Sequence, residues 1–379
     1  MSNVADVIVI GLGGMGSACC YHLASRGATV IGIDQFSPVH DLGSSHGETR
    51  VIRQAYFEHP DYVPLLKRAY TLWDELSQQT GRSLFNRTGV VYFGPRTGTL
   101  LEGIRLSARL HSIPIEEMSL MDARRRFPAF SASEGYASIY EPDAGYLAVE
   151  DCVRAHLEVA EKNGARFHWG APVLDWRMEK NSVQVRTATE TFTARRLVLT
   201  VGAWSPNLAT VLGLPLRVLR KVMFWSPVSA DSDWARMPCY LYDLPYGVVY
   251  GFGGQSGPEA KIAEHSGGAE VADPSRVNRA VQPADAENVV RAIRENIPGL
   301  IPAVTRHKVC LYTMTPDQNF ILGQHPGMPH VSIAAGFSGH GFKFASVIGE
   351  VLADLVQSGQ TPHPIGFLRG ERFLTGSRK

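Results

Sequence analysis

A glycine-rich segment near the N-terminus has the residue types and the spacing to bind a dinucleotide. Gly11, Gly13 and Gly16 fall in the pattern G-x-G-x-x-G, and Asp34 follows Gly16 by 18 residues. In this pattern the first glycine permits a tight turn, the second lets the backbone approach a pyrophosphate, and the third lets a helix pack against a strand. The helix N-terminus offers N–H groups to phosphates, and Asp34 can accept hydrogen bonds from ribose hydroxyls. The pattern does not distinguish NAD from FAD.

The elements that must position these residues form a βαβ unit. Residues 7–10 are apolar and β-branched, which is typical of a parallel strand buried on both faces. An apolar-periodic segment then runs to about Arg26 and predicts a helix, with Gly27 just past its end. A second strand is expected over residues 29–33, so that Asp34 closes it. This context makes the glycine pattern specific for dinucleotide binding.

The rest of the chain predicts an α/β (α+β) protein whose nucleotide-type pattern is interrupted. Short β-rich segments alternate with turns from residue 217 to about 261, which indicates a second, antiparallel unit. Residues 331–355 return to strand, glycine-rich turn and helix. Further helices are expected over residues 61–78, 150–163 and 284–296.

Composition excludes several classes of protein. The 379 residues carry a net charge of +1, which gives no field for nucleic acid or an anionic membrane surface. No apolar run reaches the ~18–20 residues that span a bilayer. Five cysteines without a framework spacing favour reduced thiols in a cytoplasmic protein. No cluster of cysteine and histidine has zinc spacing, so no metal site is expected.

Beyond the glycine pattern, the chain resembles the monomeric sarcosine oxidase and N-methyltryptophan oxidase family of FAD-dependent amine oxidases. Three stretches carry the resemblance: GSSHGETRVIR at positions 43–53, GAW at 202–204 and AGFSGHGFKF at 335–344. The resemblance implies a glutathione-reductase-type FAD-binding Rossmann domain with a second, mixed β-sheet substrate domain. The FAD-binding domain is expected over residues 1–85, 145–215 and 305–379, and the substrate domain over 86–144 and 216–304.

The same resemblance assigns residues to FAD. The expected cofactor-binding residues are Gly11, Gly13, Gly16, Asp34, Val173, Gly202, Trp204, Cys310, Gly339, Gly341 and Lys343. Cys310 matches the family cysteine that forms a thioether to the flavin 8α-methyl carbon. Judged by composition alone, Cys310 would instead be a small buried hydrophobe.

Substrate and catalytic residues also follow from the resemblance. Arg53 and Lys343 match the pair that holds a substrate carboxylate, for which Arg offers a planar fork and Lys a point charge. Lys261 matches the lysine beside the flavin where oxygen is reduced. The remaining matches are Arg50 and His46 near the flavin ring, and Tyr250, His265 and Tyr312 on the substrate side. Each of these residues taken alone would be a surface cation, a strand aromatic or a loop histidine.

The implied activity is oxidation of a small secondary N-methyl amino acid of the sarcosine type by a monomeric enzyme. The imine product would hydrolyse to an aldehyde and an amino acid, and O2 would be reduced to hydrogen peroxide. Ser45 and residues 253–260 depart from the family pattern, and Leu241 and Tyr242 occupy the region of the substrate pocket, so the exact amine stays open. The alternatives are a dehydrogenase with another acceptor, an oxidase of a cyclic or glycated amino acid, and a non-catalytic flavin-binding subunit. A nicotinamide dehydrogenase would explain only the glycine pattern.

Overall fold

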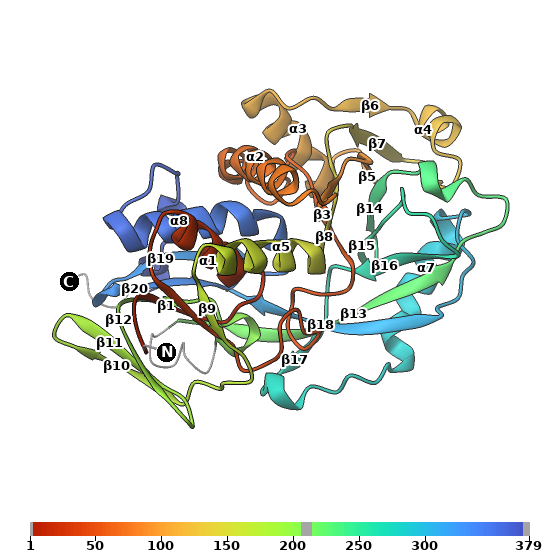
Figure 1. Cartoon of the computed structure of the whole chain (residues 1–379). Coiled ribbons are helices and arrows are strands. Elements are labelled where there is room, and N and C mark those ends of the chain that lie inside the picture. The colour runs from red at the N-terminus through yellow and green to blue at the C-terminus, as the bar shows by residue number, and fades with distance from the viewer. Residues whose placement is uncertain (1–2, 206–213, 374–379) are drawn as a thin grey trace.

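The computed structural model describes residues 3–205 and 214–373, which build three β-sheets and the helices that cover them (Figure 1). The eight-stranded sheet has the order β10-β11-β12-β1-β2-β9, with β20 beside β12 and β19 beside β20. Its strands are β1 (Val4–Ile10), β2 (Val30–Ile33), β9 (Arg166–His168), β10 (Asp175–Glu179), β11 (Ser182–Arg186), β12 (Thr191–Leu199), β19 (Ile321–His325) and β20 (Met328–Ala335).

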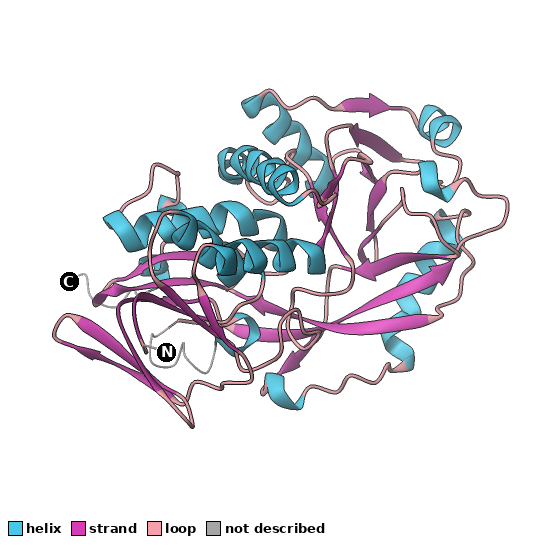
Figure 2. Cartoon of the chain, in the orientation of Figure 1, coloured by secondary structure: helices cyan, strands magenta, loops and turns pink. Residues whose placement is uncertain are grey.

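The centre of this sheet confirms the predicted βαβ unit. β1 pairs in parallel with both β2 and β12, and its residues from Val7 to Ile10 are buried. Gly27 follows the last helical turn with φ +84°, the left-handed conformation expected after a helix end. The helices α1 (Gly14–Ser25), α2 (Val63–Thr80), α5 (Val149–Lys162) and α8 (Ala345–Ser358) pack on one another. They gather on one side of the sheet, away from the β10–β11 hairpin (Figure 2).

A nine-stranded sheet forms the second unit and is mixed, as the α/β (α+β) prediction requires. Its order is β17-β13-β16-β15-β14-β5-β7-β6, with β18 also beside β13, and only β5 and β14 pair in parallel among its neighbours. The strands are β5 (Val90–Pro95), β6 (Glu116–Met118), β7 (Tyr136–Glu141), β13 (Arg217–Pro227), β14 (Cys239–Leu244), β15 (Gly247–Gly251), β16 (Glu259–Glu264), β17 (Ala269–Val271) and β18 (Arg306–Met314). The helices α3 (Thr99–His111), α4 (Leu120–Arg126) and α7 (Pro283–Asn296) lie against this sheet.

Strand β18 belongs to a different sheet from the one that the predicted domain division implies. Residues 305–379 were expected in the FAD-binding domain, yet β18 pairs with β13 from Arg306 to Met314 (Figure 1). This ladder of cross-strand hydrogen bonds places the segment in the nine-stranded sheet. The other domain boundaries stay a prediction.

A small three-stranded sheet joins the two units. It contains β3 (Thr49–Ile52), β8 (Gly145–Ala148) and β4 (Phe85–Asn86), and β3 carries Arg50 and leads to Arg53. Among the described residues, short 3₁₀ helices lie at Pro60–Tyr62, Gly202–Trp204, Trp234–Arg236, Pro274–Arg276, Phe342–Phe344, Gly366–Leu368 and Gly370–Phe373. Within the described ranges, no helix combines the length and apolar character needed to cross a bilayer.

Candidate active site

A cavity of about 560 Å³ lies where the two large sheets meet. The parallel strands β1, β2 and β12 all end at it, because Gly11, Asp34 and Thr200 directly follow them and line it. Ligands of open α/β sheets bind at this carboxyl edge. From the other side, β18 contributes Cys310 and Tyr312. The cavity therefore connects the glycine-rich segment predicted to bind a dinucleotide with the residues predicted to act on the flavin and the substrate.

The glycines of the first loop are required for different reasons. Gly11 has φ +88°, and a Cβ there would stand 2.6 Å from the Thr200 carbonyl oxygen. A Cβ on Gly16 would stand 1.8 Å from the Gly11 carbonyl oxygen, so Gly16 serves the packing of α1 and does not line the cavity. A Cβ on Gly13 would meet only the Ser45 hydroxyl, at 3.5 Å. The space beside Gly13 is thus kept open toward the cavity, as backbone approach to a pyrophosphate requires.

Asp34 has two functions at this end. Its carboxylate accepts hydrogen bonds from the N–H groups of Leu12, at 2.7 Å, and Phe36, at 2.9 Å. The side chain therefore locks the glycine loop to the end of β2. It also lines the cavity, so its remaining acceptor capacity is available to a ligand there, and its contact with a ribose stays a prediction.

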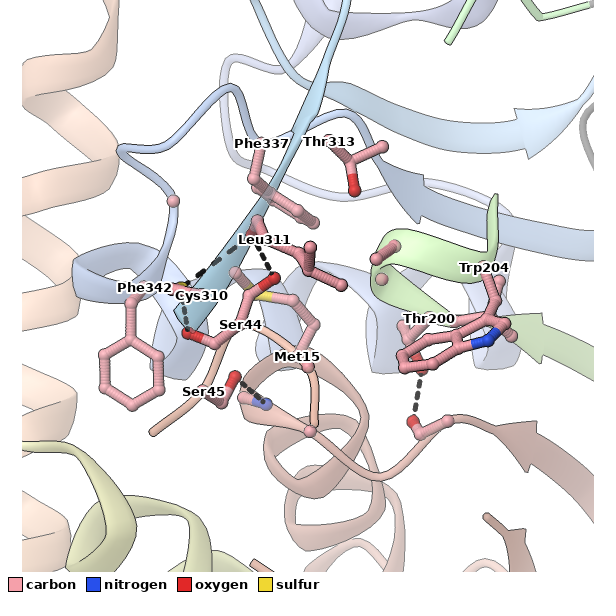
Figure 3. Close-up of a pocket in the computed structure, with 18 of the residues that line it drawn as sticks. Met15, Ser44, Ser45, Thr200, Trp204, Cys310, Leu311, Thr313, Phe337 and Phe342 are labelled. Atoms are coloured by element: carbon pink, nitrogen blue, oxygen red, sulfur yellow. Dashed lines mark hydrogen bonds between the residues drawn. The ribbon is translucent and has the colours of Figure 1, made fainter. Parts of the chain in front are cut away.

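Other predicted cofactor residues continue the lining from this end. Val173, Gly202 and Trp204 all face the cavity. The Trp204 indole N–H donates to the Ser275 hydroxyl at 3.1 Å, and its ring lies 5.1 Å from that of Phe36. Figure 3 shows Trp204 beside Thr200, across the cavity from the segment with Ser44 and Ser45. The Ser45 hydroxyl accepts from the Gly14 N–H at 3.1 Å.

Cys310 lies at the opposite end of the cavity, next to a positive charge. The Arg50 guanidinium donates to its sulfur at 3.5 Å and to the Ser44 carbonyl at 2.8 Å. The Cys310 side chain is almost fully buried from bulk water but lines the cavity. Reactive cysteines occur in such electropositive surroundings. The extent of the cavity, from Asp34 to Cys310, and the open space at Gly13 fit an extended dinucleotide such as FAD.

The glycine-rich turn after β20 closes this end of the cavity. Gly339 has φ +82°, and a Cβ there would stand 2.2 Å from the Tyr312 ring. A Cβ on Gly341 would stand 2.5 Å from the Phe337 side chain. Both glycines line the cavity and let these aromatic rings pack directly on the backbone.

Arg53 and Lys343 line the same end, and a third charged residue lies with them. Arg53, which is only 3 % exposed, donates to both carboxylate oxygens of Glu58, at 2.6 and 2.7 Å. The Lys343 ammonium donates to the His340 carbonyl at 2.7 Å. Glu58 was not predicted as a site residue, and the sequence offers no signal for it beyond its position five residues after Arg53. The cationic pair is therefore partly neutralised by an acid of the protein itself.

Burial sets the protonation of these groups. Burial, reinforced by the nearby Arg53, lowers the pKa of Lys343 to about 7. Burial alone would raise the pKa of Glu58, but the charge of Arg53 and its hydrogen bonds, with further contributions from Lys343 and, at acid pH, His340, lower it to about 2. Glu58 is therefore ionised at neutral pH, whereas Lys343 titrates near pH 7.

A wall of uncharged polar rings faces these charges. Tyr250, His265 and Tyr312 line the cavity together with Leu241. The Tyr312 hydroxyl lies 3.5 Å from His265 Nδ1. Burial raises the pKa of both tyrosines and lowers that of His265 to about 4. At neutral pH this wall carries no charge.

Two predicted catalytic residues lie behind the cavity lining. The Lys261 ammonium is fully buried and donates to the carbonyls of Gly47, at 2.6 Å, and Thr49, at 2.7 Å. His46 Nε2 lies 3.1 Å from the Gly43 carbonyl, and its Nδ1 is buried without a hydrogen-bond partner in the described chain. Burial lowers the pKa of both side chains, that of His46 to about 3. Both residues hold the segment that leads into β3, the strand that carries Arg50, and their contact with flavin or oxygen stays a prediction.

Comparison with known proteins agrees with the geometry. The family model described as FAD dependent oxidoreductase matches residues 6–355. The chain is 41 % identical to monomeric sarcosine oxidase of Streptomyces avermitilis, over 98 % of this chain and 99 % of that protein. It is 34 % identical to N-methyl-L-tryptophan oxidase of Yersinia pestis, over 97 % and 99 %. The solved structure of NikD, an amino acid oxidase of nikkomycin biosynthesis, has the same fold, with a TM-score of 0.86 at 22 % identity over 97 % and 98 % of the two chains.

Proposed function

The chain belongs to the monomeric sarcosine oxidase and N-methyltryptophan oxidase family of FAD-dependent oxidoreductases, and we propose that it oxidises a small secondary N-methyl amino acid. One observation carries this proposal. Two buried cations, Arg53 and Lys343, line the same cavity as the glycine loop and Cys310. A carboxylate bound by these cations would hold an amino acid at the end of the cavity that Cys310 occupies.

The residues that would hold FAD form a continuous lining. Gly11, Gly13 and Asp34 serve the nucleotide end, and Cys310 and Gly339 lie at the other end. Bound FAD would supply the two-electron acceptor for oxidation of the carbon beside the amine nitrogen, and O2 would take up those electrons to give hydrogen peroxide. We propose that Cys310 attaches the flavin covalently, a role supported by its place in the lining and by the Arg50 charge at its sulfur.

A substrate carboxylate that reaches Arg53 meets a guanidinium that is already paired with Glu58. The guanidinium donates to both carboxylate oxygens of Glu58, so a substrate carboxylate competes with Glu58 or shares Arg53 with it. Lys343 has one hydrogen bond, to the His340 carbonyl, and an ammonium has two further donors to offer. The uncharged wall of Tyr250, His265 and Tyr312 would then enclose the amine, which is oxidised as the neutral base. The imine hydrolyses to an aldehyde and an amino acid, formaldehyde and glycine for sarcosine.

One observation keeps a flavin-dependent dehydrogenase as a second candidate. Lys261, the predicted oxygen-site lysine, donates to two backbone carbonyls and does not line the cavity. Turnover compared in air and under nitrogen with an artificial acceptor separates the two activities. An oxidase needs oxygen and releases one peroxide per amine, whereas a dehydrogenase turns over equally well without oxygen.

The proposed function is tested by a peroxide-coupled screen beside an intact mass spectrum. The screen covers N-methyl, cyclic and glycated amino acids, and we expect turnover of a small N-methyl amino acid. The spectrum should show the mass of FAD added to the chain, and Cys310→Ala should lose that addition while still binding FAD reversibly. A colourless protein without flavin, or no turnover of any secondary amino acid, would contradict the proposal.

We further propose that the enzyme acts as a monomer in the cytoplasm. The names of its sarcosine oxidase relatives include the monomeric state. All five cysteines are free and buried, which suits a reducing compartment. Light scattering of the purified protein should give the mass of one chain, and a stable dimer would contradict this assignment.

A further inference from the structure

Tyr56 lies directly behind the two cations of the proposed carboxylate site. Its ring is fully buried and does not line the cavity. The Arg53 guanidinium carbon lies 4.4 Å from the ring centroid, and the Lys343 ammonium lies 5.2 Å from it. A cation within about 6 Å of an aromatic face is attracted to it. One ring therefore contacts both charges that would receive the substrate carboxylate.

The hydroxyl of Tyr56 begins a chain of hydrogen bonds that leads back to Lys343. The hydroxyl lies 2.5 Å from His340 Nδ1 and, more weakly, 3.5 Å from the His340 carbonyl oxygen, and His340 Nε2 lies 3.1 Å from the Gln318 carbonyl. The carbonyl of His340 in turn accepts the Lys343 ammonium at 2.7 Å. His340 is thus held at both ring nitrogens and at its backbone oxygen.

The protonation states of Tyr56 and His340 determine which atom donates in each of these hydrogen bonds. Burial raises the pKa of Tyr56 well above its usual value and lowers the pKa of His340 to about 3. Both side chains are neutral at neutral pH. A carbonyl can only accept, so His340 carries its proton on Nε2 and donates to Gln318, and the Tyr56 hydroxyl donates to Nδ1. Removal of that hydroxyl would leave Nδ1 buried without a donor.

We propose that Tyr56 is a positioning residue that gives the site its preference for amines bearing a carboxylate. Its ring holds Arg53 and Lys343 in place, and its hydroxyl fixes the His340 carbonyl that orients the Lys343 ammonium. This inference rests on the proposed function, because it concerns the same substrate site. It extends the proposal by assigning specificity to a side chain that touches neither substrate nor cofactor.

The chain offers a matched control in Tyr62. This residue is also fully buried, and its ring lies 5.2 Å from that of Tyr56. Its hydroxyl likewise makes two hydrogen bonds, donating to Asn319 Oδ1 at 3.2 Å and accepting from the Phe320 N–H at 3.1 Å. Those bonds do not lead to Lys343. Tyr62→Phe therefore removes a comparable buried hydroxyl from the same aromatic cluster without releasing the cations.

The test compares Tyr56→Phe and Tyr62→Phe on two substrates in the flavin-loaded enzyme. One substrate is sarcosine, and the other is N-methylethylamine, which lacks the carboxylate. For Tyr56→Phe we expect kcat/KM for sarcosine to fall about tenfold, mostly through KM, the size expected for one buried hydrogen bond. The value for N-methylethylamine should not change, and Tyr62→Phe should alter the two substrates equally.

A binding measurement keeps this test independent of turnover. Acetate is titrated calorimetrically into the wild-type protein and both variants, and thermal unfolding is recorded for each. Tyr56→Phe should weaken acetate binding about tenfold, whereas Tyr62→Phe should leave it unchanged at a similar melting temperature. Equal acetate affinity in all three proteins, or an equal loss on both amines, would overturn the assignment of Tyr56. Absence of turnover by the wild type would instead overturn the proposed function.

Discussion

The two ends of the cavity are built in different ways. At the nucleotide end the lining is backbone: Gly11 adopts a left-handed conformation, Gly13 leaves open space, and Asp34 locks the loop by accepting main-chain N–H groups. At the carboxylate end the lining is buried charge, with Arg53 and Lys343 balanced by Glu58. The first end is sensitive to added atoms, and the second, apart from its turn at Gly339 and Gly341, is sensitive to changed charge. At each end, therefore, one substitution is expected to damage folding and another to damage binding alone.

The largest effect is expected at Gly16. A methyl group there would stand 1.8 Å from the Gly11 carbonyl, so Gly16→Ala should displace α1 from β1 and yield little folded protein. Gly13→Ala meets only the Ser45 hydroxyl at 3.5 Å, so that variant should fold but lose most of its FAD, because the methyl group fills the space of the pyrophosphate. Thermal unfolding and the ratio of flavin to protein measure the two effects.

Gly366→Ala provides a control for these glycine variants. An added Cβ there has open space, and the backbone conformation is not left-handed. Folding and flavin content should equal those of the wild type. A Gly13→Ala variant with full flavin content would show that the open space at Gly13 does not serve the cofactor.

The second largest effect is expected at the carboxylate end, where two variants of Arg53 and Glu58 separate a loss of stability from a loss of substrate binding. Arg53→Met leaves the half-buried Glu58 carboxylate without its main partner, which should lower the unfolding free energy by about 3 kcal/mol, the lower end of the range for a buried pair. The double variant Arg53→Met, Glu58→Gln removes both charges and should recover most of that loss. Its kcat/KM for an N-methyl amino acid should still be about 100-fold or more below the wild type, since a buried charged partner of the carboxylate is gone.

Denaturant unfolding and steady-state kinetics measure these two variants side by side. If the double variant regained activity together with stability, Arg53 would be a structural residue and not a carboxylate ligand. If neither variant lost activity, the comparison between the two ends would fail.

A smaller effect is expected from pH. With a pKa of about 7, Lys343 is charged below pH 7 and loses its proton as the pH rises through that value. Of the charged groups that act on it, Arg53 and Glu58 keep their charge across this range. The dissociation constant of acetate, which has no amine to titrate, should therefore rise several-fold, at most about tenfold per pH unit above the pKa.

Lys343→Arg sharpens this pH prediction. Arginine stays protonated throughout the range, so acetate binding by this variant should be nearly independent of pH between 6 and 9. Calorimetric titrations at several pH values decide the matter. A wild type whose acetate affinity does not change with pH would show that Lys343 keeps its charge or does not contact the carboxylate.

The βαβ unit at the nucleotide end was predicted correctly, because that unit is encoded locally. The glycine pattern, the strand before it and Asp34 lie within one βαβ unit, and each glycine has a steric reason that its neighbours reveal. The carboxylate end, which Arg53, Lys343 and Glu58 line, depends on contacts between distant segments. Tyr56 and His340 are 284 positions apart, and neither Tyr56 nor Glu58 belongs to a motif. Likewise, no local pattern could show that Lys261 faces the carbonyls of the loop at Gly47 or that β18 joins the nine-stranded sheet.

The central claim is that the cavity holds FAD and grips an amino acid by its carboxylate between Arg53 and Lys343. A crystal structure of the flavin-loaded protein with methoxyacetate tests it most directly, because this ligand matches sarcosine in shape but has an ether in place of the oxidisable amine. We predict carboxylate oxygens about 3 Å from the Arg53 guanidinium and the Lys343 ammonium, with flavin next to Cys310. A carboxylate bound elsewhere, with Arg53 still paired only to Glu58, would contradict the account.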